Sequence, residues 1–291
     1  MIPTSVIIPT YNGAYKVLNC LKALEQQTTK EFETIVVVDG STDNTIEVLK
    51  GNTFSLSLKI HYRENGGRSV ARNSGVQEAN GELIIFLDDD MRATANLVEE
   101  HIKFHKKNKG ILVGVPKEEP SVMKTDFQKF KAHLSEKWMN ELGSTTVKLE
   151  HSFLTSANCS IPKIIFERLK GFDENLTDAE DYDLAVKAQE QNIDIYFEPN
   201  AIAWHDDFIT CKSYIKRLRE YHKAHQKLNE LYPERHTKII SKIDKSILKS
   251  IVFSFFSFDF WQILIDRNRL RFLPLKIRYK IYDWVITSQS S

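Results

Sequence analysis

Cysteine is scarce in this chain, and the signs of export are missing. Only three of the 291 residues are cysteines, Cys20, Cys159 and Cys211, and they lie far apart. This odd, widely spaced set argues against a disulfide framework and against a cysteine zinc site. The N-terminus passes from Met1 directly into a strand-like stretch, without the basic start, apolar middle and cleavage site of a secretory signal. We therefore expect a cytoplasmic protein.

Long apolar runs are missing as well. Residues 251–265 are strongly apolar, but this run is shorter than the roughly 20 residues that cross a bilayer, and Asp259 interrupts it. Hydrophobic residues make up 42% of the chain and charged residues 27%, which are the values of an ordinary globular protein. This composition argues against a disordered, collagen-like or polytopic membrane protein.

Positive charge is concentrated at the C-terminal end. Residues 1–210 carry 23 Lys and Arg against 32 Asp and Glu, whereas residues 211–291 carry 17 against 7. The net charge of +1 therefore conceals −9 in the first segment and +10 in the second. A basic segment joined to an acidic body indicates an anionic partner, either a membrane surface or a nucleic acid. Residues 212–231 and 238–250 of this C-terminal extension are predicted to be basic amphipathic helices.

Short β-branched runs alternate with polar helical stretches in the first half of the chain. This alternation predicts βαβ units, and hence a Rossmann-like, mostly parallel α/β sheet with helices on both faces. Because each run is continuously apolar, we expect every strand to be buried at the centre of the sheet. The predicted strands are 6–8, 34–38, 60–62, 83–87 and 111–115, and the predicted helices are 14–27, 43–50, 70–79 and 95–107.

The stretch that follows is less regular. Residues 116–150 are predicted to be a charged insertion with one helix over 124–142. Beyond it a second organised block is expected to close the domain at His205. Its predicted strands are 154–161, 194–197 and 201–204, and its predicted helices are 163–169 and 180–191.

Polar and flexible residues follow three of the predicted strands at the point where each strand ends. In open parallel sheets a ligand binds in the crevice outside the carboxyl ends of the strands. We therefore expect these three segments to form one ligand site. Their sequences are Pro9-Thr10-Tyr11-Asn12-Gly13, Asp39-Gly40-Ser41-Thr42-Asp43 and Asp88-Asp89-Asp90.

The triplet of Asp88, Asp89 and Asp90 is the sharpest of these features. Three adjacent carboxylates raise one another's pKa unless a cation compensates them, and Mg²⁺ or Mn²⁺ binds such hard oxygen ligands. The Asp-x-Asp spacing lets Asp88 and Asp90 point the same way from an extended strand end. The alternative is an acidic loop that is merely solvated.

Two further residues, Asp39 and Arg72, are candidates for binding a nucleotide. Asp39 could accept a hydrogen bond from a base N–H or a ribose hydroxyl, or it could simply cap the next helix. Arg72, with Arg68 nearby, lies in a segment whose glycines allow close backbone approach and whose guanidinium groups suit phosphate oxygens. The glycines match neither the phosphate loop of kinases nor the dinucleotide fingerprint of oxidoreductases.

Taken in order, these motifs resemble those of family-two glycosyltransferases, which have the GT-A fold. The matching segments run from Ser5 to Gly13, from Val36 to Asp43, over Arg72-Asn73 and from Leu87 to Asp90, and the similarity extends to about His205. The resemblance implies a nucleotide-sugar half over about 1–115 and an acceptor half over about 150–210. The residues that it assigns to the nucleotide-sugar donor are Pro9, Tyr11, Asn12, Asp39, Arg72, Asp88 and Asp89. It further implies that Asp88 and Asp90 form the Asp-x-Asp motif, with Asp90 as the direct metal ligand.

The same resemblance covers the acceptor side. Glu180-Asp181-Tyr182-Asp183 is similar to the family's Glu-Asp motif, which makes Asp181 the predicted catalytic base and places Glu180 and Asp183 beside the acceptor. The alternative is that these acidic residues only favour the first turn of a helix. His205 is the predicted additional metal ligand, and an imidazole ligand favours Mn²⁺ over Mg²⁺. A surface or core histidine is the alternative there.

These expectations define a metal-dependent enzyme that moves one sugar, with inversion, from a nucleotide-diphosphate donor, UDP by resemblance, to an acceptor hydroxyl. The Gln-x-x-Arg-Trp motif of processive synthases is absent, which favours transfer of a single sugar. The acceptor is expected to be a lipid-linked or bacterial surface glycan. The alternatives are a sugar-nucleotide nucleotidyltransferase, and a non-enzymatic nucleotide- or nucleic-acid-binding protein, with nucleic acid disfavoured.

The aromatic residues near the C-terminus suggest where such an enzyme would work. Phe255, Phe256, Phe258 and Trp261 would suit an interfacial helix on the inner face of a cell membrane. The alternative is a helical cap packed on the catalytic domain, or the seam of a homo-oligomer.

Overall fold

The computed structural model describes residues 2–150, 152–236 and 253–290. They form two compact units: unit 1 is Met1–Glu118 with Met139–Asp206, and unit 2 is Glu119–Trp138 with Asp207–Ser291. The predicted boundary at residue 210 lies close to the observed one at 206. The sequence of the charged insertion did not predict that residues 119–138 belong with the C-terminal segment. The helix predicted over 238–250 lies outside the described residues.

Unit 1 is built on a nine-stranded sheet with the strand order β3-β2-β1-β4-β8-β6-β9-β5, in which β7 also pairs with β9. The longest ladders are parallel, whereas β8 runs antiparallel to both of its neighbours, β4 and β6. The stretches predicted as two strands near 195 and 203 form the single strand β9. The strands are β1 Thr4–Thr10, β2 Glu33–Asp39, β3 Ser57–Arg63, β4 Leu83–Leu87, β5 Met91–Ala93, β6 Ile111–Lys117, β7 Val147–Lys148, β8 Asn158–Pro162 and β9 Ile195–His205.

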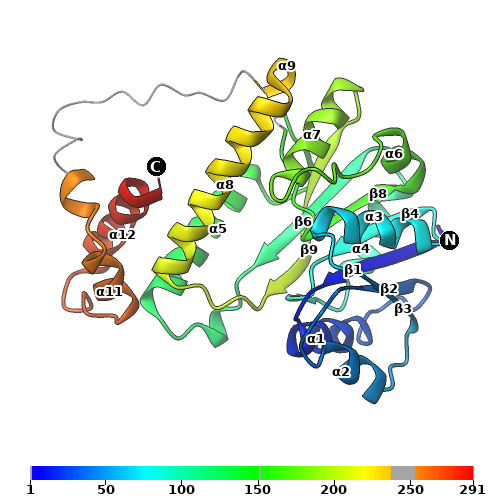
Figure 1. Ribbon diagram of the computed structural model, residues 1–291, viewed down its shortest axis with the longest axis horizontal. Coiled ribbons are helices and arrows are strands. Elements are labelled where there is room, and N and C mark those ends of the chain that lie inside the picture. Colours follow the sequence, from blue (N-terminus) through cyan, green and yellow to red (C-terminus); the bar gives the residue numbers. More distant parts are fainter. Residues whose placement is uncertain (1, 151, 237–252, 291) are drawn as a thin grey trace. The chain divides into compact units, whose positions relative to one another are not determined.

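Helices cover both faces of the sheet because successive strand residues point to opposite sides. Ile7 of β1 packs with α3, α6 and α7, whereas its neighbours Val6 and Ile8 pack with α1, α2 and α4. This arrangement confirms the predicted α/β class with helices on both faces (Figure 1). Each fully buried large side chain contributes about 1.5–3 kcal/mol. The helices are α1 Ala14–Leu24, α2 Thr45–Gly51, α3 Arg68–Glu78, α4 Leu97–His105, α6 Lys163–Arg168 and α7 Glu180–Glu190.

The expectation that every strand is central was wrong for β3. This strand lies at the edge of the sheet, and exposed residues alternate along it. The sequence of Ser57–Arg63 already carries that alternation of polar and apolar residues, as a half-exposed strand does. The short strand β5 was not predicted at all. It follows the Asp triplet directly and pairs with the end of β9, so that Met91 lies opposite His205.

Unit 2 is helical and has a hydrophobic core of its own. Phe127 of α5 packs there with Ile215 of α8, Ile265 of α11 and Tyr282 of α12. The buried phenol of Tyr282 donates a hydrogen bond of 2.8 Å to Asp126. No helix within the described residues is both long and apolar enough to cross a membrane. The elements are the 3₁₀ turn Pro120–Val122, α5 Asp126–Leu142, which continues into unit 1, α8 Cys211–Leu231, α9 Pro233–His236, α11 Phe260–Asp266 and α12 Leu275–Ser290.

Candidate active site

The loops after β1 and β2 are tied together through Asn12. Its side-chain oxygen accepts hydrogen bonds from the backbone N–H groups of Thr42 at 2.7 Å and Asp43 at 3.2 Å. Asn12 has a φ of 51°, a left-handed conformation that asparagine tolerates better than most residues. The neighbouring Tyr11 leaves 53% of its surface exposed. The two predicted nucleotide-binding loops therefore form one structure with an exposed aromatic ring beside Pro9, near the end of β1.

Asp39 is buried at the end of β2, and it does not cap α2. One carboxylate oxygen accepts hydrogen bonds from the backbone N–H of Gly66 at 3.0 Å and from Arg63 at 2.5 Å. The other accepts from the N–H of Gly67 at 2.8 Å. Gly67 has a φ of +88° and precedes α3, so this carboxylate holds the turn that starts the helix carrying Arg72. From the sequence, Asp39 was expected either to accept a hydrogen bond from a nucleotide or to cap the next helix, so this role was not predicted.

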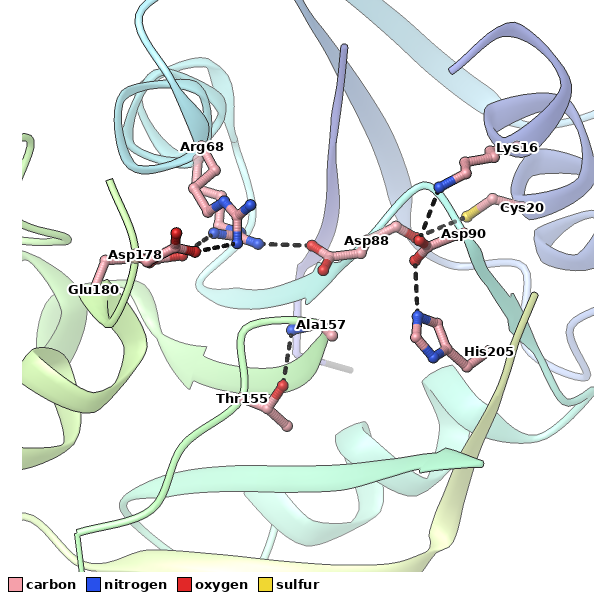
Figure 2. A network of polar contacts seen from close by, with 11 residues as sticks. Lys16, Cys20, Arg68, Asp88, Asp90, Thr155, Ala157, Asp178, Glu180 and His205 are labelled. Atoms are coloured by element: carbon pink, nitrogen blue, oxygen red, sulfur yellow. Dashed lines mark hydrogen bonds and ion pairs between the residues drawn. The ribbon is translucent and has the colours of Figure 1, made fainter. Parts of the chain in front are cut away.

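The three aspartates between β4 and β5 have different partners, and Figure 2 shows two of them, Asp88 and Asp90. Asp88 accepts a hydrogen bond of 2.7 Å from Arg72. Asp89 accepts one of 2.6 Å from the hydroxyl of Thr10. Asp90 lies between the ammonium of Lys16 at 3.2 Å and the imidazole of His205 at 3.6 Å. The turn lies at the carboxyl end of β4. It is held on one side by the pairing of β4 with β8 and on the other by the pairing of β5 with β9.

The two carboxyls that follow Asp88 have opposite pKa shifts. Burial raises the pKa of Asp89 to about 7, since the hydrogen bond from Thr10 offsets that effect only in part. Burial also opposes the charged form of Asp90, but His205 and Lys16 outweigh it and hold the pKa of Asp90 below its ordinary value. Of these two carboxyls, Asp90 is therefore the one whose charged form is favoured, and it lies beside the imidazole of His205.

Asp90 and His205 fit a divalent cation by the chemistry of their donor atoms. A carboxylate oxygen and an imidazole nitrogen 3.6 Å apart can both reach one ion by a small movement, and this mixed set suits Mn²⁺. Asp88 does not join them, because its carboxylate faces Arg72. Within the described residues no three His, Cys, Asp or Glu side chains converge as a ready-made metal site. Of the three predicted metal ligands, the structure brings Asp90 and His205 together and turns Asp88 to another partner.

Arg72 joins the donor side of the predicted site to the acceptor side. Its guanidinium is only 3% exposed and donates to Asp88 at 2.7 Å and to Glu180 at 2.8 Å. It also lies over the ring of Phe172, 5.6 Å from the centroid. Burial alone would lower the pKa of Arg72, but Asp88 and Glu180 hold it above its ordinary value. Arg72 was predicted to reach the donor, whereas its terminal nitrogens here bind two protein carboxylates.

The predicted base, Asp181, follows a strained residue. Ala179 has a φ of 62°, which costs a residue with a Cβ about 1 kcal/mol or more, and it directly precedes α7. Glu180, the next residue, accepts a hydrogen bond of 2.8 Å from Arg72. Asp181 is partly exposed and accepts a hydrogen bond from the N–H of Tyr182 at 2.8 Å. Burial and the neighbouring charge of Glu180 raise the pKa of Asp181 to about 7, which is the range a general base requires.

Asp183 has no exposed surface and pairs with Lys187 one turn later, at 2.7 Å. The prediction that it faces an acceptor does not match this position, because a completely buried carboxylate cannot touch a bound sugar. Its place on the inner side of α7 follows from helical spacing, since it lies three residues after Glu180.

Several residues at the site had no assigned role in the sequence reading. Asn73 binds the loop before α7, accepting from the N–H of Phe172 at 3.0 Å and donating to its carbonyl at 2.9 Å. Ser69 donates to the carbonyl of Leu176 at 3.1 Å. Lys16 reaches Asp90 from α1. Because Ser69 and Asn73 lie at i and i+4 and Arg72 at i+3, all three share one face of α3. From the sequence, this spacing on a predicted helix could have indicated that Ser69 and Asn73 lie on the same side as Arg72.

The fold and the site together define a GT-A glycosyltransferase architecture, and three solved structures match it. A mannosyltransferase from Pyrobaculum calidifontis, PcManGT, solved with GDP-Man and Mn²⁺, has a TM-score of 0.64 at 17% identity, covering 99% of this chain and 86% of its own. Residues 1–349 of TarS from Staphylococcus aureus give 0.56 at 19%, covering 100% and 91%. The same part of TarS in complex with UDP-GlcNAc gives 0.54 at 20%.

The chain belongs to the glycosyl transferase family 2, whose model matches residues 5–170. The uncharacterized glycosyltransferase RT0329 of Rickettsia typhi is 30% identical over 222 residues, which cover 75% of this chain and 68% of RT0329. The uncharacterized glycosyltransferase YfnE of Bacillus subtilis is 39% identical over 111 residues, 38% of this chain. The aligned part spans only 28% of the length of YfnE.

Proposed function

We propose that this protein transfers a single sugar from a nucleotide-diphosphate donor, a UDP-sugar, to an acceptor hydroxyl with inversion. Membership of the family supports transfer chemistry. The observation that carries the proposal is the bridge of Arg72 between Asp88 and Glu180, which lie at the donor and acceptor ends of one site. A nucleotidyltransferase or a nucleic-acid-binding protein has no need of such a bridge.

The base in this proposal is Asp181. The acceptor oxygen attacks the anomeric carbon while its proton passes to the Asp181 carboxylate, and the bond from that carbon to the nucleoside diphosphate breaks. A base with a pKa of about 7 is half ionised at neutral pH, so it can take the proton and release it afterwards. Arg72 is a positioning residue, which holds Glu180 in place next to this base.

The nucleotide part of the donor would lie along the loops after β1 and β2. Tyr11 offers an exposed ring for the base. Asp39 would act there by holding the turn at Gly66 and Gly67 in place, since its carboxylate oxygens already accept hydrogen bonds from that turn. Asp90 and His205 would hold Mn²⁺ or Mg²⁺. Bound there, the ion would supply positive charge to balance the departing diphosphate. Asp88 and Asp89 flank this position.

The carrier and the acceptor are also part of the proposal. The TarS structures with UDP and UDP-GlcNAc support UDP, whereas the structure of PcManGT holds GDP-Man. We propose a glycan or lipid-linked acceptor in bacterial surface glycan synthesis, made at the inner face of the cell membrane. TarS itself is a poly(ribitol-phosphate) β-N-acetylglucosaminyltransferase, 34% identical over 112 residues that cover 20% of its length.

Calorimetric titration of UDP, GDP and dTDP, each with Mn²⁺, Mg²⁺ or EDTA, tests the donor site. We expect one nucleotide to bind with a divalent cation, and the Asp90→Asn variant to lose that binding. Glu78→Gln, a change at the last residue of α3, serves as the control and should bind as the wild type does. If none of the three nucleotides binds, the proposed function is wrong.

Hydrolysis or transfer of the matching nucleotide sugars then tests the base. Asp181→Asn should keep nucleotide binding and lose about 10²–10⁴-fold in turnover. Glu190→Gln, at the exposed far end of the same helix, should retain turnover. An Asp181→Asn variant with wild-type turnover would remove this residue from the mechanism.

A further inference from the structure

Unit 2 carries a concentration of exposed apolar side chains. Fifteen large hydrophobic side chains are exposed among the described residues, and seven of these lie between residues 255 and 277. Single exposed hydrophobics are normal on any protein, but so many in one short segment mark an interaction surface. The seven are Phe255, Phe258, Phe260, Ile263, Phe272, Leu275 and Ile277.

Four aromatic side chains around the start of α11 touch one another, and we call Phe255, Phe258, Phe260 and Trp261 the aromatic cluster. The ring centroids of Phe260 and Trp261 are 4.9 Å apart, and those of Phe255 and Trp261 are 5.4 Å apart. The indole N–H of Trp261 donates to the carbonyl of Phe255 at 3.0 Å, which fixes the turn. Ile263 lies three residues after Phe260, so it extends the cluster along the same side of the helix.

The segment that carries the exposed cluster is itself packed on the core of unit 2. Within the same segment Phe256 is 7% exposed and Ile265 has no exposed surface, and both belong to the core of unit 2. The predicted interfacial set had included Phe256, which the structure buries, and had omitted Phe260. The segment therefore has an inner side in the core and an outer side with exposed phenylalanines, and the partly buried Trp261 connects the two by packing on Phe256, with ring centroids 4.8 Å apart.

Cationic side chains adjoin the aromatic cluster. The loop of residues 267–271, which we call the basic loop, joins α11 to the turn before α12, and Arg267, Arg269 and Arg271 are all exposed. Phe272 follows directly and is 80% exposed, the highest value among the large hydrophobic residues. The exposed Lys276 continues the positive charge into α12. A membrane-surface segment combines aromatic residues with Lys and Arg, and the arginines of the basic loop with Lys276 offer positive charge to an anionic surface.

We propose that the aromatic cluster and the basic loop dock on an anionic lipid bilayer, with the rings at the acyl boundary and the arginines on the headgroups. Aromatic rings partition into the interfacial region of a bilayer, and each Arg near an anionic surface adds electrostatic attraction. The net charge of +10 on residues 211–291 favours the same partner. This docking does not depend on the transferase activity, because it uses unit 2 alone.

Flotation of the full chain with lipid vesicles tests the proposal without any nucleotide sugar. The chain should float with phosphatidylglycerol–phosphatidylcholine vesicles and should bind them at least about tenfold more tightly than phosphatidylcholine alone. Replacing Phe255, Phe258 and Phe260 together by Ser should weaken binding by at least about tenfold. The control is Ile164→Ser, which removes an apolar side chain that is 73% exposed on α6.

A second variant keeps the test decisive if the triple Ser variant misfolds, which circular dichroism would reveal. Changing Arg267, Arg269 and Arg271 together to Gln removes charge from exposed positions and should abolish the preference for anionic vesicles. Failure of the wild-type chain to float, or equal binding to neutral and anionic vesicles, overturns the proposal. So does a lipid-free dimer, seen by light scattering, that the Ser variant converts to a monomer, because the surface would then bind a second copy.

Discussion

A buried histidine on α4 makes the stability of unit 1 depend on pH. His101 has no exposed surface; its Nε2 lies 3.0 Å from Asn158 Oδ1 and its Nδ1 lies 2.8 Å from the hydroxyl of Ser160. The amide nitrogen of Asn158 donates to the carbonyl of Ala201, so its oxygen must accept from Nε2–H. The Nδ1 atom is then an acceptor, which receives the hydrogen bond of Ser160. With His105 Nε2 as a donor, the hydroxyl oxygen in turn accepts from it at 2.8 Å, and this network is complete with neutral His101.

The size of the effect follows from the pKa. Burial lowers the pKa of His101 from 6.5 to about 4, with the hydrogen bond to Asn158 opposing the shift only in part. The unfolded chain therefore binds more protons than the folded one between these two values. The stabilising contribution is complete above pH 6.5 and is lost as the pH falls toward 4. Between about pH 7.5 and about pH 5 the linkage relation gives a loss of about 2 kcal/mol in the free energy of unfolding.

Urea denaturation at these two pH values, monitored by circular dichroism, measures that loss. The reference is His101→Gln, because an amide offers the same donor and acceptor without titrating. We expect the wild-type chain to lose about 2 kcal/mol more than His101→Gln between the two pH values. The titrating groups away from His101, including the raised carboxyls of the active site, are common to both proteins and cancel. The pKa of His105 is lowered by burial first and by His101 second, so only the smaller, second contribution differs between the two proteins. An equal loss in the two proteins would refute the assigned tautomers and the neutral state of His101.

Three further predictions concern the active site. Because the pKa of Asp181 is raised to about 7, the carboxylate is ionised above that value, so turnover should rise with pH through about 7 in a pH–rate profile. Replacing Lys16 by Gln removes the cation that lies 3.2 Å from Asp90, so calorimetry should show Mn²⁺ affinity raised by roughly two- to fivefold; a lower affinity would show that the ammonium assists the metal. Replacing Arg72 by Met leaves Glu180 buried without its partner, so urea denaturation should show a loss of about 3 kcal/mol, and an unchanged stability would show that the bridge is dispensable.

The sequence predicted those parts of the fold that depend on local pattern. The apolar run 83–87 coincides with β4, and the four parallel strands β1 to β4 with the helices between them follow βαβ rules that the alternation of apolar and polar runs reveals. The sequence did not predict that β8 lies antiparallel between β4 and β6, because tertiary packing rather than residue type determines which strands pair. Residues 119–138 were assigned to the wrong side of the domain boundary for the same reason.

The candidate site was predicted in its residue types more than in its pairings. Strand ends located Asn12, Asp39 and the Asp triplet, since every parallel strand delivers its following residues to one edge. The sequence carried no signal that Arg72 would be shared by Asp88 and Glu180, since these residues are brought together only by folding. The burial of Asp183 and the position of Lys16 beside Asp90 likewise depend on how helices are rotated against the sheet.

The position of β8 has a consequence for how the chain is made. Strand β4 pairs with β1 on one edge and with β8, residues 158–162, on the other. Strand β6 also pairs with β8, which comes later in the chain than both. When only the first 150 residues have been synthesised, β4 therefore has an open hydrogen-bonding edge, and β6 lacks both of its partners, β8 and β9. Such edges are templates for pairing with other chains. Strand β8 closes the open edge of β4 and joins β6 to it, so the sheet that carries the candidate site becomes continuous only once residues 158–162 are in place.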